Sequence, residues 1–247
     1  MKPFLTFSPL RRRAVSLGFF AVIGWMACGS LAPAAPVLDA ADKRVVDRLT
    51  VLLKQRVKKP NGENINLLIV PTARASEGYF SHIRMSGSPA QLKKKLRVSE
   101  FSLDARNVRV KVPLLWSDDR VRTFSSQTTL RAVITEDDLT HLLSRGKRTK
   151  DMGLKIKFLG DRVAVTGNIN YMLVNGPISG IAKMKMMPGH KINLQILSMK
   201  LRGVEVPQMI KNQFENHINP MIDYEDLPFN PPFKSVKVVG KKAYIST

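Results

Sequence analysis

The C-terminal part of the chain contains Gly203-Val204-Glu205-Val206-Pro207, Ile218-Asn219-Pro220-Met221-Ile222-Asp223 and Leu227-Pro228, and this proline-punctuated stretch is the most informative part of the sequence. Proline is favoured at a helix start and disfavours helical backbone in the residue before it, so the prolines bracket a helix that we place at residues 206–219. The paired apolar segments Ser235–Val239 and Ala243–Ile245 follow and predict a final hairpin.

Apolar residues recur at helical spacing in two places. The C-terminal helix carries one stripe of Met209, Ile210, Phe214 and Ile218. Near the other end of the domain, the region 39–60 predicts an amphipathic N-terminal helix, with Arg and Lys opposite an apolar stripe of Val45, Val46, Leu49, Leu52, Leu53 and Val57.

Between these helices the apolar period is mostly two, which is typical of strands. The phase of the alternation changes near Arg106-Asn107 and again between Ile196 and Leu197. Because a phase change moves side chains to the other face, we expect a bulge or turn at both places and a strongly curved sheet. The polar stretch Trp116–Gln127 is expected to be a loose connection.

A short helix is predicted in the middle of the chain. Thr135 precedes Glu136-Asp137-Asp138, the pattern of an N-cap followed by an acidic first turn, and the helix buries leucines before ending near Gly146. Each half of the chain thus has strands followed by a helix, which hints at a duplication, although no residue-level repeat supports it.

Residues 1–34 have the order of a secretory signal peptide. Lys2 and Arg11-Arg12-Arg13 precede the uncharged run Ala14–Cys28, and Ala32-Pro33-Ala34 supplies small residues for cleavage after Ala34. An uncleaved anchor is the alternative, but the run is shorter than the roughly 18–20 residues of a spanning helix. We therefore expect an exported protein with a single domain at residues 35–247, in the periplasm or on the extracytoplasmic face of the membrane.

Cys28 is the only cysteine. Trp25-Met26-Ala27 is a poor match to the residues that precede a lipidated cysteine, so lipoprotein anchoring at Cys28 is a minor alternative. The mature domain without cysteine forms no disulfide, and its core must supply its stability.

The chain is strongly basic, with 40 Lys and Arg against 19 Asp and Glu and a net charge of +21. Residues 1–34 carry four basic and no acidic side chains, so the expected mature chain keeps +17. This excess predicts an acidic partner. Anionic phospholipid or a phosphate-bearing wall polymer suits an exported chain, whereas nucleic acid is disfavoured by export and by the few aromatics near the basic clusters.

No arrangement typical of an enzyme is present in the sequence. The histidines are isolated, with no pair at metal-ligand spacing: His82, His141, His190 and His217. Gly176-Pro177-Ile178-Ser179-Gly180 misses the nucleophile-elbow pattern by one position, and Asp223, Glu225 and Asp226 fit no calcium loop. We expect no catalysis, no metal and no cofactor.

The order of elements resembles the LmeA-like phospholipid-binding family of bacterial envelope proteins. The resemblance rests on Leu96–Leu103, on Ile134-Thr135-Glu136-Asp137-Asp138-Leu139 and on the proline-punctuated ending, and it covers roughly residues 40–247. It implies an α+β, tubular lipid-binding (TULIP-like) fold, in which a strongly curved antiparallel sheet wraps around a long helix and leaves an apolar groove for acyl chains. It also implies an exported, non-enzymatic protein that binds phospholipid.

For the lining of that groove we choose a set rich in methionine, whose flexible side chain adapts to acyl chains of different length. The set is Met172, Met184, Met186, Met199, Met209, Ile210 and Phe214. Gap-filling in an ordinary core is the alternative for each of them.

Two basic clusters are candidates for contact with anionic headgroups or the membrane. The first is Lys93-Lys94-Lys95 with Arg97, and the second is Lys147 with Arg148. A solvated loop is the alternative explanation for the first cluster, and the second lies at the end of the short helix.

The sequence therefore predicts an exported cell-envelope protein that binds phospholipid acyl chains and supports lipid binding or transfer. The competing hypothesis is a structural or adaptor protein that binds an acidic wall polymer or an envelope protein through its basic surface. Strongly salt-sensitive binding without extractable lipid would distinguish the adaptor.

Overall fold

The computed structural model describes residues 37–247 except 93–95, 118–120, 148, 172–173, 189–190, 224–226, 228, 230 and 232; the side chains of residues 171 and 174 also lie outside the description. The expected signal peptide at 1–34, Cys28 included, lies outside the described residues. Residues 36–247 form one compact unit, and everything below concerns that unit.

The first part of this unit contains, in chain order, α1 (Ala40–Arg56), β1 (Val57–Lys58), β2 (Asn66–Pro71), η1 (Ala75–Glu77), β3 (Tyr79–Gly87), β4 (Ala90–Leu92), β5 (Leu96–Val98), β6 (Glu100–Val110), α2 (Val112–Ser117) and β7 (Thr123–Thr135). The second part contains α3 (Glu136–Ser144), η2 (Lys150–Met152), β8 (Lys155–Leu159), β9 (Arg162–Tyr171), β10 (Val174–Met187), β11 (Lys191–Leu201), β12 (Val204–Glu205), α4 (Gln208–Ile218), β13 (Ile222–Asp223), β14 (Ser235–Val239) and β15 (Lys242–Ser246).

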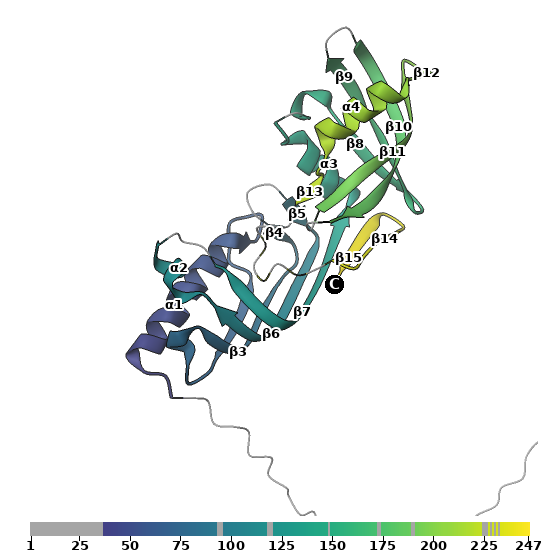
Figure 1. Ribbon diagram of the computed structural model, residues 1–247. Helices are drawn as coiled ribbons and strands as arrows, with labels where there is room; N and C mark the ends of the chain where they lie inside the picture. Colours follow the sequence, from purple (N-terminus) through teal and green to yellow (C-terminus); the bar gives the residue numbers. More distant parts are fainter. Residues whose placement is uncertain are drawn as a thin grey trace, which may run out of the picture. The chain divides into compact units, whose positions relative to one another are not determined.

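The strands pair into antiparallel sheets, which Figure 1 shows with their helices. The first sheet has the order β14-β15-β7-β6-β3-β2, and the second sheet has the order β12-β11-β10-β9-β8 with β13 also pairing β11. A small third sheet has the order β1-β4-β5. The α+β class is as expected, but the strands are divided among three sheets where the resemblance implied one; the tubular lipid-binding fold stays a prediction.

Helix α1 covers the inner face of the first sheet. Asp39 caps its start by accepting a hydrogen bond from the backbone N–H of Asp42 at 2.7 Å. Its buried stripe consists of Val45, Leu49, Leu52 and Leu53. The helix ends at Arg56, short of the expected residue 60, because Val57 and Lys58 pair with β4 instead.

The two predicted phase changes take different forms. In the second sheet Ile181 pairs with Ser198 and Ala182 with Ile196, so Leu197 is the extra residue of a bulge, and the expectation is confirmed. In β6 the pairing with β7 keeps one register through the phase change, and Asn107 adopts a positive φ of 49°. The left-handed backbone of Asn107 therefore moves the apolar side chains that follow it in β6 to the other alternation phase, without an inserted residue.

The expectation of a loose connection over Trp116–Gln127 is wrong at both ends. The first end belongs to α2, where Leu115 is fully buried and its carbonyl accepts a hydrogen bond from Arg48 Nε at 2.9 Å. The other end belongs to β7, which starts at Thr123 and pairs with β6. Both structures depend on partners distant in sequence, which a local pattern does not reveal.

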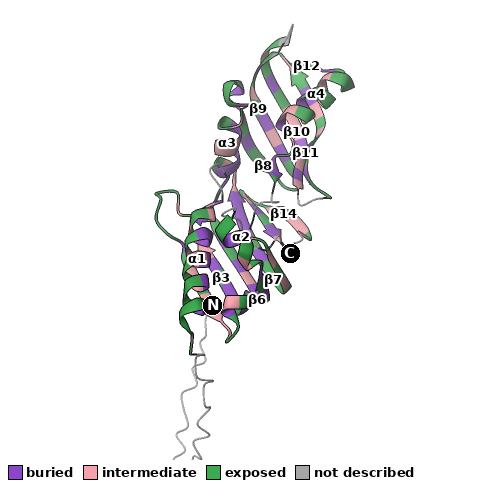
Figure 2. Ribbon diagram, turned by 60° about the vertical axis from the view of Figure 1, so that its left-hand side comes forward, coloured by how far each residue is buried: buried purple, intermediate pink, exposed green. Residues whose placement is uncertain are grey.

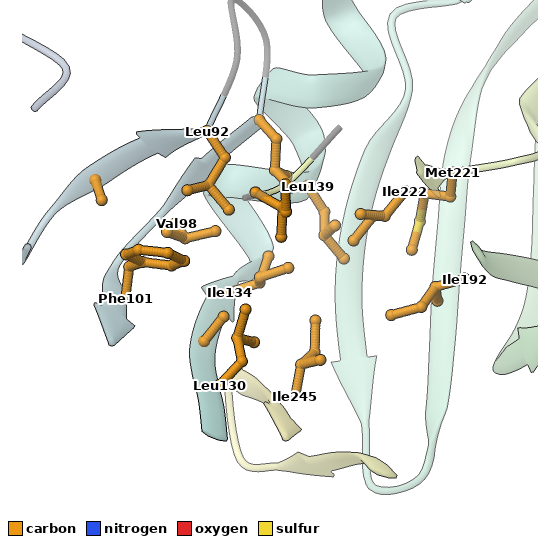
Figure 3. Close-up of a cluster of buried hydrophobic side chains, with 14 of the residues drawn as sticks. Leu92, Val98, Phe101, Leu130, Ile134, Leu139, Ile192, Met221, Ile222 and Ile245 are labelled. Atoms are coloured by element: carbon orange, nitrogen blue, oxygen red, sulfur yellow. The ribbon is translucent and has the colours of Figure 1, made fainter. Parts of the chain in front are cut away.

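One continuous apolar core connects the first and second sheets. Figure 3 shows buried side chains from strands of both sheets and from α3 pointing into the same cluster. Its labelled members are Leu92, Val98, Phe101, Leu130, Ile134, Leu139, Ile192, Met221, Ile222 and Ile245.

Candidate lipid site beneath the C-terminal helix

Helix α4 packs on the inner face of the second sheet. It begins after Pro207 and ends where Asn219 takes extended backbone before Pro220, as the proline pattern predicted. Phe214 and Ile218 are buried against the sheet, and Ile210 packs half-buried against the same core. In Figure 2 buried and exposed positions alternate along β9 and β10, so one face of this sheet is apolar and the other is polar.

Polar side chains also fasten α4 to β11. Glu215 Oε1 accepts from the backbone N–H of Ile196 at 2.5 Å, and Asn219 Oδ1 accepts from the N–H of Leu194 at 2.8 Å. Asn219 Nδ2 returns a hydrogen bond to the carbonyl of Leu194 at 2.9 Å. These hydrogen bonds satisfy backbone groups on the segment of the β11 edge between its pairings with β12 and β13.

An apolar pocket lies between α4 and the sheet. Its volume is only about 10 Å³, so side chains nearly fill it in this conformation. Gly180 lies between Val165 and Met199 in the sheet register, and the missing side chain at this position helps to leave the space. The pocket is lined by Val165, Ile178, Ser179, Gly180, Ile181, Ala182, Ile196, Met199, Phe214 and Ile218.

Two of the chosen groove residues, Met199 and Phe214, line this pocket. Met184 is buried on the same sheet face, and Met186 is 36% exposed. Met209 is 68% exposed and does not line the pocket, because it belongs to the first turn of α4 and points to solvent. Met172 lies outside the described residues, and half-buried Ile210 packs beside the pocket without lining it.

The choice of methionines missed most of the lining. Val165, Ile178, Ala182 and Ile196 occupy alternate positions on the inner faces of β9, β10 and β11. The period-two pattern marks each of them as inward-facing, but only the pairing register places them under α4.

The predicted basic clusters are only partly within the described residues. Arg97 Nε lies 3.4 Å from Asp138 Oδ1, so its charge is partly neutralised. Lys147 is exposed, whereas Lys93, Lys94, Lys95 and Arg148 lie outside the description.

A different basic surface is built by the outer face of the second sheet. Strand alternation places exposed cations there, and we call this set the basic face: Lys155, Lys157, Arg162, Lys183, Lys185 and Lys200. Among the described residues its one ion pair is Lys183 with Asp161 at 3.2 Å, where the hydrogen bond from Lys183 holds the pKa of Asp161 below its usual value. The basic face therefore keeps most of its charge.

The described residues contain no group of three or more His, Cys, Asp or Glu side chains arranged to hold a metal ion. His82 Nε2 lies 3.0 Å from Asp104 Oδ1, and His217 Nδ1 lies 3.0 Å from the carbonyl of Gln213. Within the same residues, no helix has both the length and the apolar character needed to cross a bilayer.

Comparison with known proteins returned no matching curated protein and no matching solved structure. A protein-family model does match, and it covers residues 42–242, which is most of the chain. The chain belongs to the LmeA-like phospholipid-binding family.

Proposed function

We propose that the protein is exported to the cell envelope and holds a phospholipid acyl chain between α4 and the inner face of the second sheet. The observation that carries this proposal is the apolar pocket beneath α4, lined by side chains such as Met199, Phe214 and Ile218. Family membership supports phospholipid as the ligand class.

Binding requires α4 to lift, because the pocket is closed by side chains. Lifting breaks the hydrogen bonds of Glu215 and Asn219 to β11, at a cost of about 3–6 kcal/mol for one charged and two neutral bonds. Each buried methylene contributes about 0.8 kcal/mol, so roughly four to eight methylenes offset that cost. An ordinary acyl chain is long enough to hold the helix open.

The basic face supports binding of the protein to an anionic membrane. A cation near an anionic membrane contributes on the order of 1 kcal/mol, and the basic face presents several on one sheet surface. We place the protein at the extracytoplasmic face of the membrane, with anionic phospholipid as both docking surface and ligand source. A role in lipid transfer and envelope maintenance follows if the bound lipid exchanges between membranes.

The basic face also favours the second candidate, an adaptor for an acidic wall polymer. Its exposed lysines need no pocket to bind a polyanion, and this binding weakens steeply with salt because exposed charges are screened beyond about 8 Å at physiological ionic strength. Lipid bound through the pocket survives a salt wash, so the two candidates give different results in the same experiment.

The test is lipid occupancy in matched variants. The full chain is expressed with export in a bacterial host, washed in high salt, and examined by intact mass spectrometry together with its organic extract. Ala182→Phe fills the pocket from β10. Ala164→Phe makes the same change on the outer face of β9, and thermal unfolding checks that both variants fold.

Stoichiometric phospholipid in the wild type and in Ala164→Phe, but not in folded Ala182→Phe, is the expected result. Equal occupancy in all three proteins would move the lipid away from α4. A wild-type protein that stays empty after incubation with liposomes would favour the adaptor.

A further inference from the structure

The outer face of the first sheet carries a row of polar residues that crosses all six strands. Successive strand pairs place these residues opposite one another, in the order Asn66, Ser86, Ser102, Arg131, Ser246 and Ser235. We call them the polar row. At about 4.8 Å between neighbouring strands, the row extends roughly 24 Å across the sheet.

A hollow of about 700 Å³ lies over this row. Its floor is low because the residues there are small, including Ser86, Gly87 and Ser102. Val133 and Tyr244, in the next register row, also line the hollow, and Tyr244 is 43% exposed. The hollow is on the opposite side of the first sheet from the core side chains, so it is separate from the pocket beneath α4.

Arg131 is the cation at the centre of the polar row. Within the described part of the chain it has no ion-pair partner, whereas Arg84, Arg106 and Lys242 on this face are paired. Arg84 lies 2.8 Å and Arg106 3.8 Å from the carboxylate of Asp104, and Lys242 lies 3.4 Å from Glu100. An exposed guanidinium flanked by the hydroxyls of Ser102 and Ser246 therefore remains available.

We infer that the hollow over the polar row binds a phosphate group. A guanidinium presents N–H donors in a planar fork that matches phosphate oxygens, and serine hydroxyls on either side add neutral donors. Glu100 and Tyr244, in the next register row, then lie beside the uncharged remainder of the ligand, for which we take a small polyol.

The phosphate has two possible sources with the same chemistry, a phospholipid headgroup presented by a bilayer or a soluble phosphorylated polyol. This inference does not depend on the acyl pocket, because the two sites share no lining residue.

The experiment uses the full chain with three probes: inorganic phosphate, sn-glycerol 3-phosphate, and vesicles of phosphatidylglycerol in phosphatidylcholine. Arg131→Gln removes the charge, and Ser102→Leu fills the floor without changing charge. Arg106→Gln is the matched control, because it removes an arginine from the same face outside the hollow. Calorimetry measures the soluble probes, co-sedimentation measures the vesicles, and thermal unfolding confirms that each variant folds.

Arg131→Gln is expected to weaken binding about tenfold or more, because charge-assisted hydrogen bonds are the strong ones. Ser102→Leu is expected to weaken it similarly, and Arg106→Gln to leave it within about twofold. Binding of glycerol 3-phosphate with this pattern assigns the soluble source, whereas the same pattern with vesicles alone assigns the lipid headgroup. The inference is overturned if Arg131→Gln and Ser102→Leu bind every probe like wild type, or if Arg106→Gln weakens binding as much as Arg131→Gln.

Discussion

Glu215 of α4 accepts a hydrogen bond from the backbone N–H of Ile196, and Asn219 one turn later accepts from Leu194. Four residues advance about 6 Å along a helix, and two residues advance about 6.6 Å along a strand. Acceptor side chains four residues apart on the helix therefore match backbone N–H donors two residues apart on the strand. The helix α3 uses the same spacing, with Glu136 on Phe158 and Thr140 on Ile156. On both β11 and β8, an adjacent helix thus supplies hydrogen-bond acceptors to backbone N–H groups that no neighbouring strand pairs.

The Glu215 bond predicts that α4 is released when this side chain is shortened. Glu215→Ala leaves the N–H of Ile196 unpaired and is expected to lower the free energy of unfolding by about 1–3 kcal/mol. Gln213→Ala, an exposed change on the same helix, is the control and is expected to stay within about 0.5 kcal/mol. Urea unfolding measures both.

Hydrogen exchange of the Ile196 amide gives an independent readout of the same release. Its exchange is expected to accelerate in Glu215→Ala while the amide of Ile156 keeps its wild-type rate. Unchanged protection at Ile196 would mean that α4 does not depend on this bond.

Phe214 and Met209 both belong to the apolar stripe of α4, yet the structure predicts that they contribute differently to the free energy of unfolding. Phe214 is 4% exposed, so Phe214→Ala is expected to cost about 3–5 kcal/mol through lost burial and a cavity. Met209 is largely exposed, and Met209→Ala is expected to change stability by no more than about 0.5 kcal/mol. Comparable losses in thermal unfolding would contradict the packing of α4.

Local patterns in the sequence predicted the features that depend on neighbouring residues. The Thr135 cap is confirmed as a capping box with Asp138, and the phase change at Leu197 is confirmed as a bulge. Both signals are complete within a few residues, so they can be read before the fold is known.

Features that depend on the register between strands could not be predicted from the sequence. The alternating Lys155 and Lys157 are visible in the sequence, but their union with Lys183 and Lys200 on one face requires the pairing of β8 through β11. The polar row is a stronger example, since its residues come from six strands and only Ser235 and Ser246 belong to a hairpin that the sequence predicted. Helix α2 depends on Arg48, 67 residues before Leu115.

Asp104 predicts a loss of stability in acid. Partial burial raises its pKa, but hydrogen bonds from Arg84 and His82 outweigh this effect and hold the pKa below the usual value. Because the folded-state pKa is the lower one, this stabilisation is present above the unfolded-state pKa near 4 and is lost as pH falls through the folded-state pKa. Urea unfolding between pH 6 and pH 2.5 is expected to show the loss, and Asp104→Asn is expected to reduce its size. An unchanged pH profile in Asp104→Asn would assign the acid sensitivity to other carboxylates.

The basic face predicts which lysines control membrane docking. Lys155→Glu with Lys157→Glu reverses two charges on β8, whereas Lys43→Glu with Arg44→Glu makes the same change in net charge on exposed positions of α1. If each cation near the surface contributes about 1 kcal/mol, the β8 double variant loses about 2 kcal/mol or more and is expected to bind phosphatidylglycerol vesicles about thirtyfold or more weakly. The α1 pair is expected to cause a much smaller loss, because only groups within about a Debye length of the membrane, roughly 8 Å, feel its potential strongly. Co-sedimentation at 50 and 150 mM salt measures both variants, and equal losses would mean that net charge, rather than the basic face, directs the protein to the membrane.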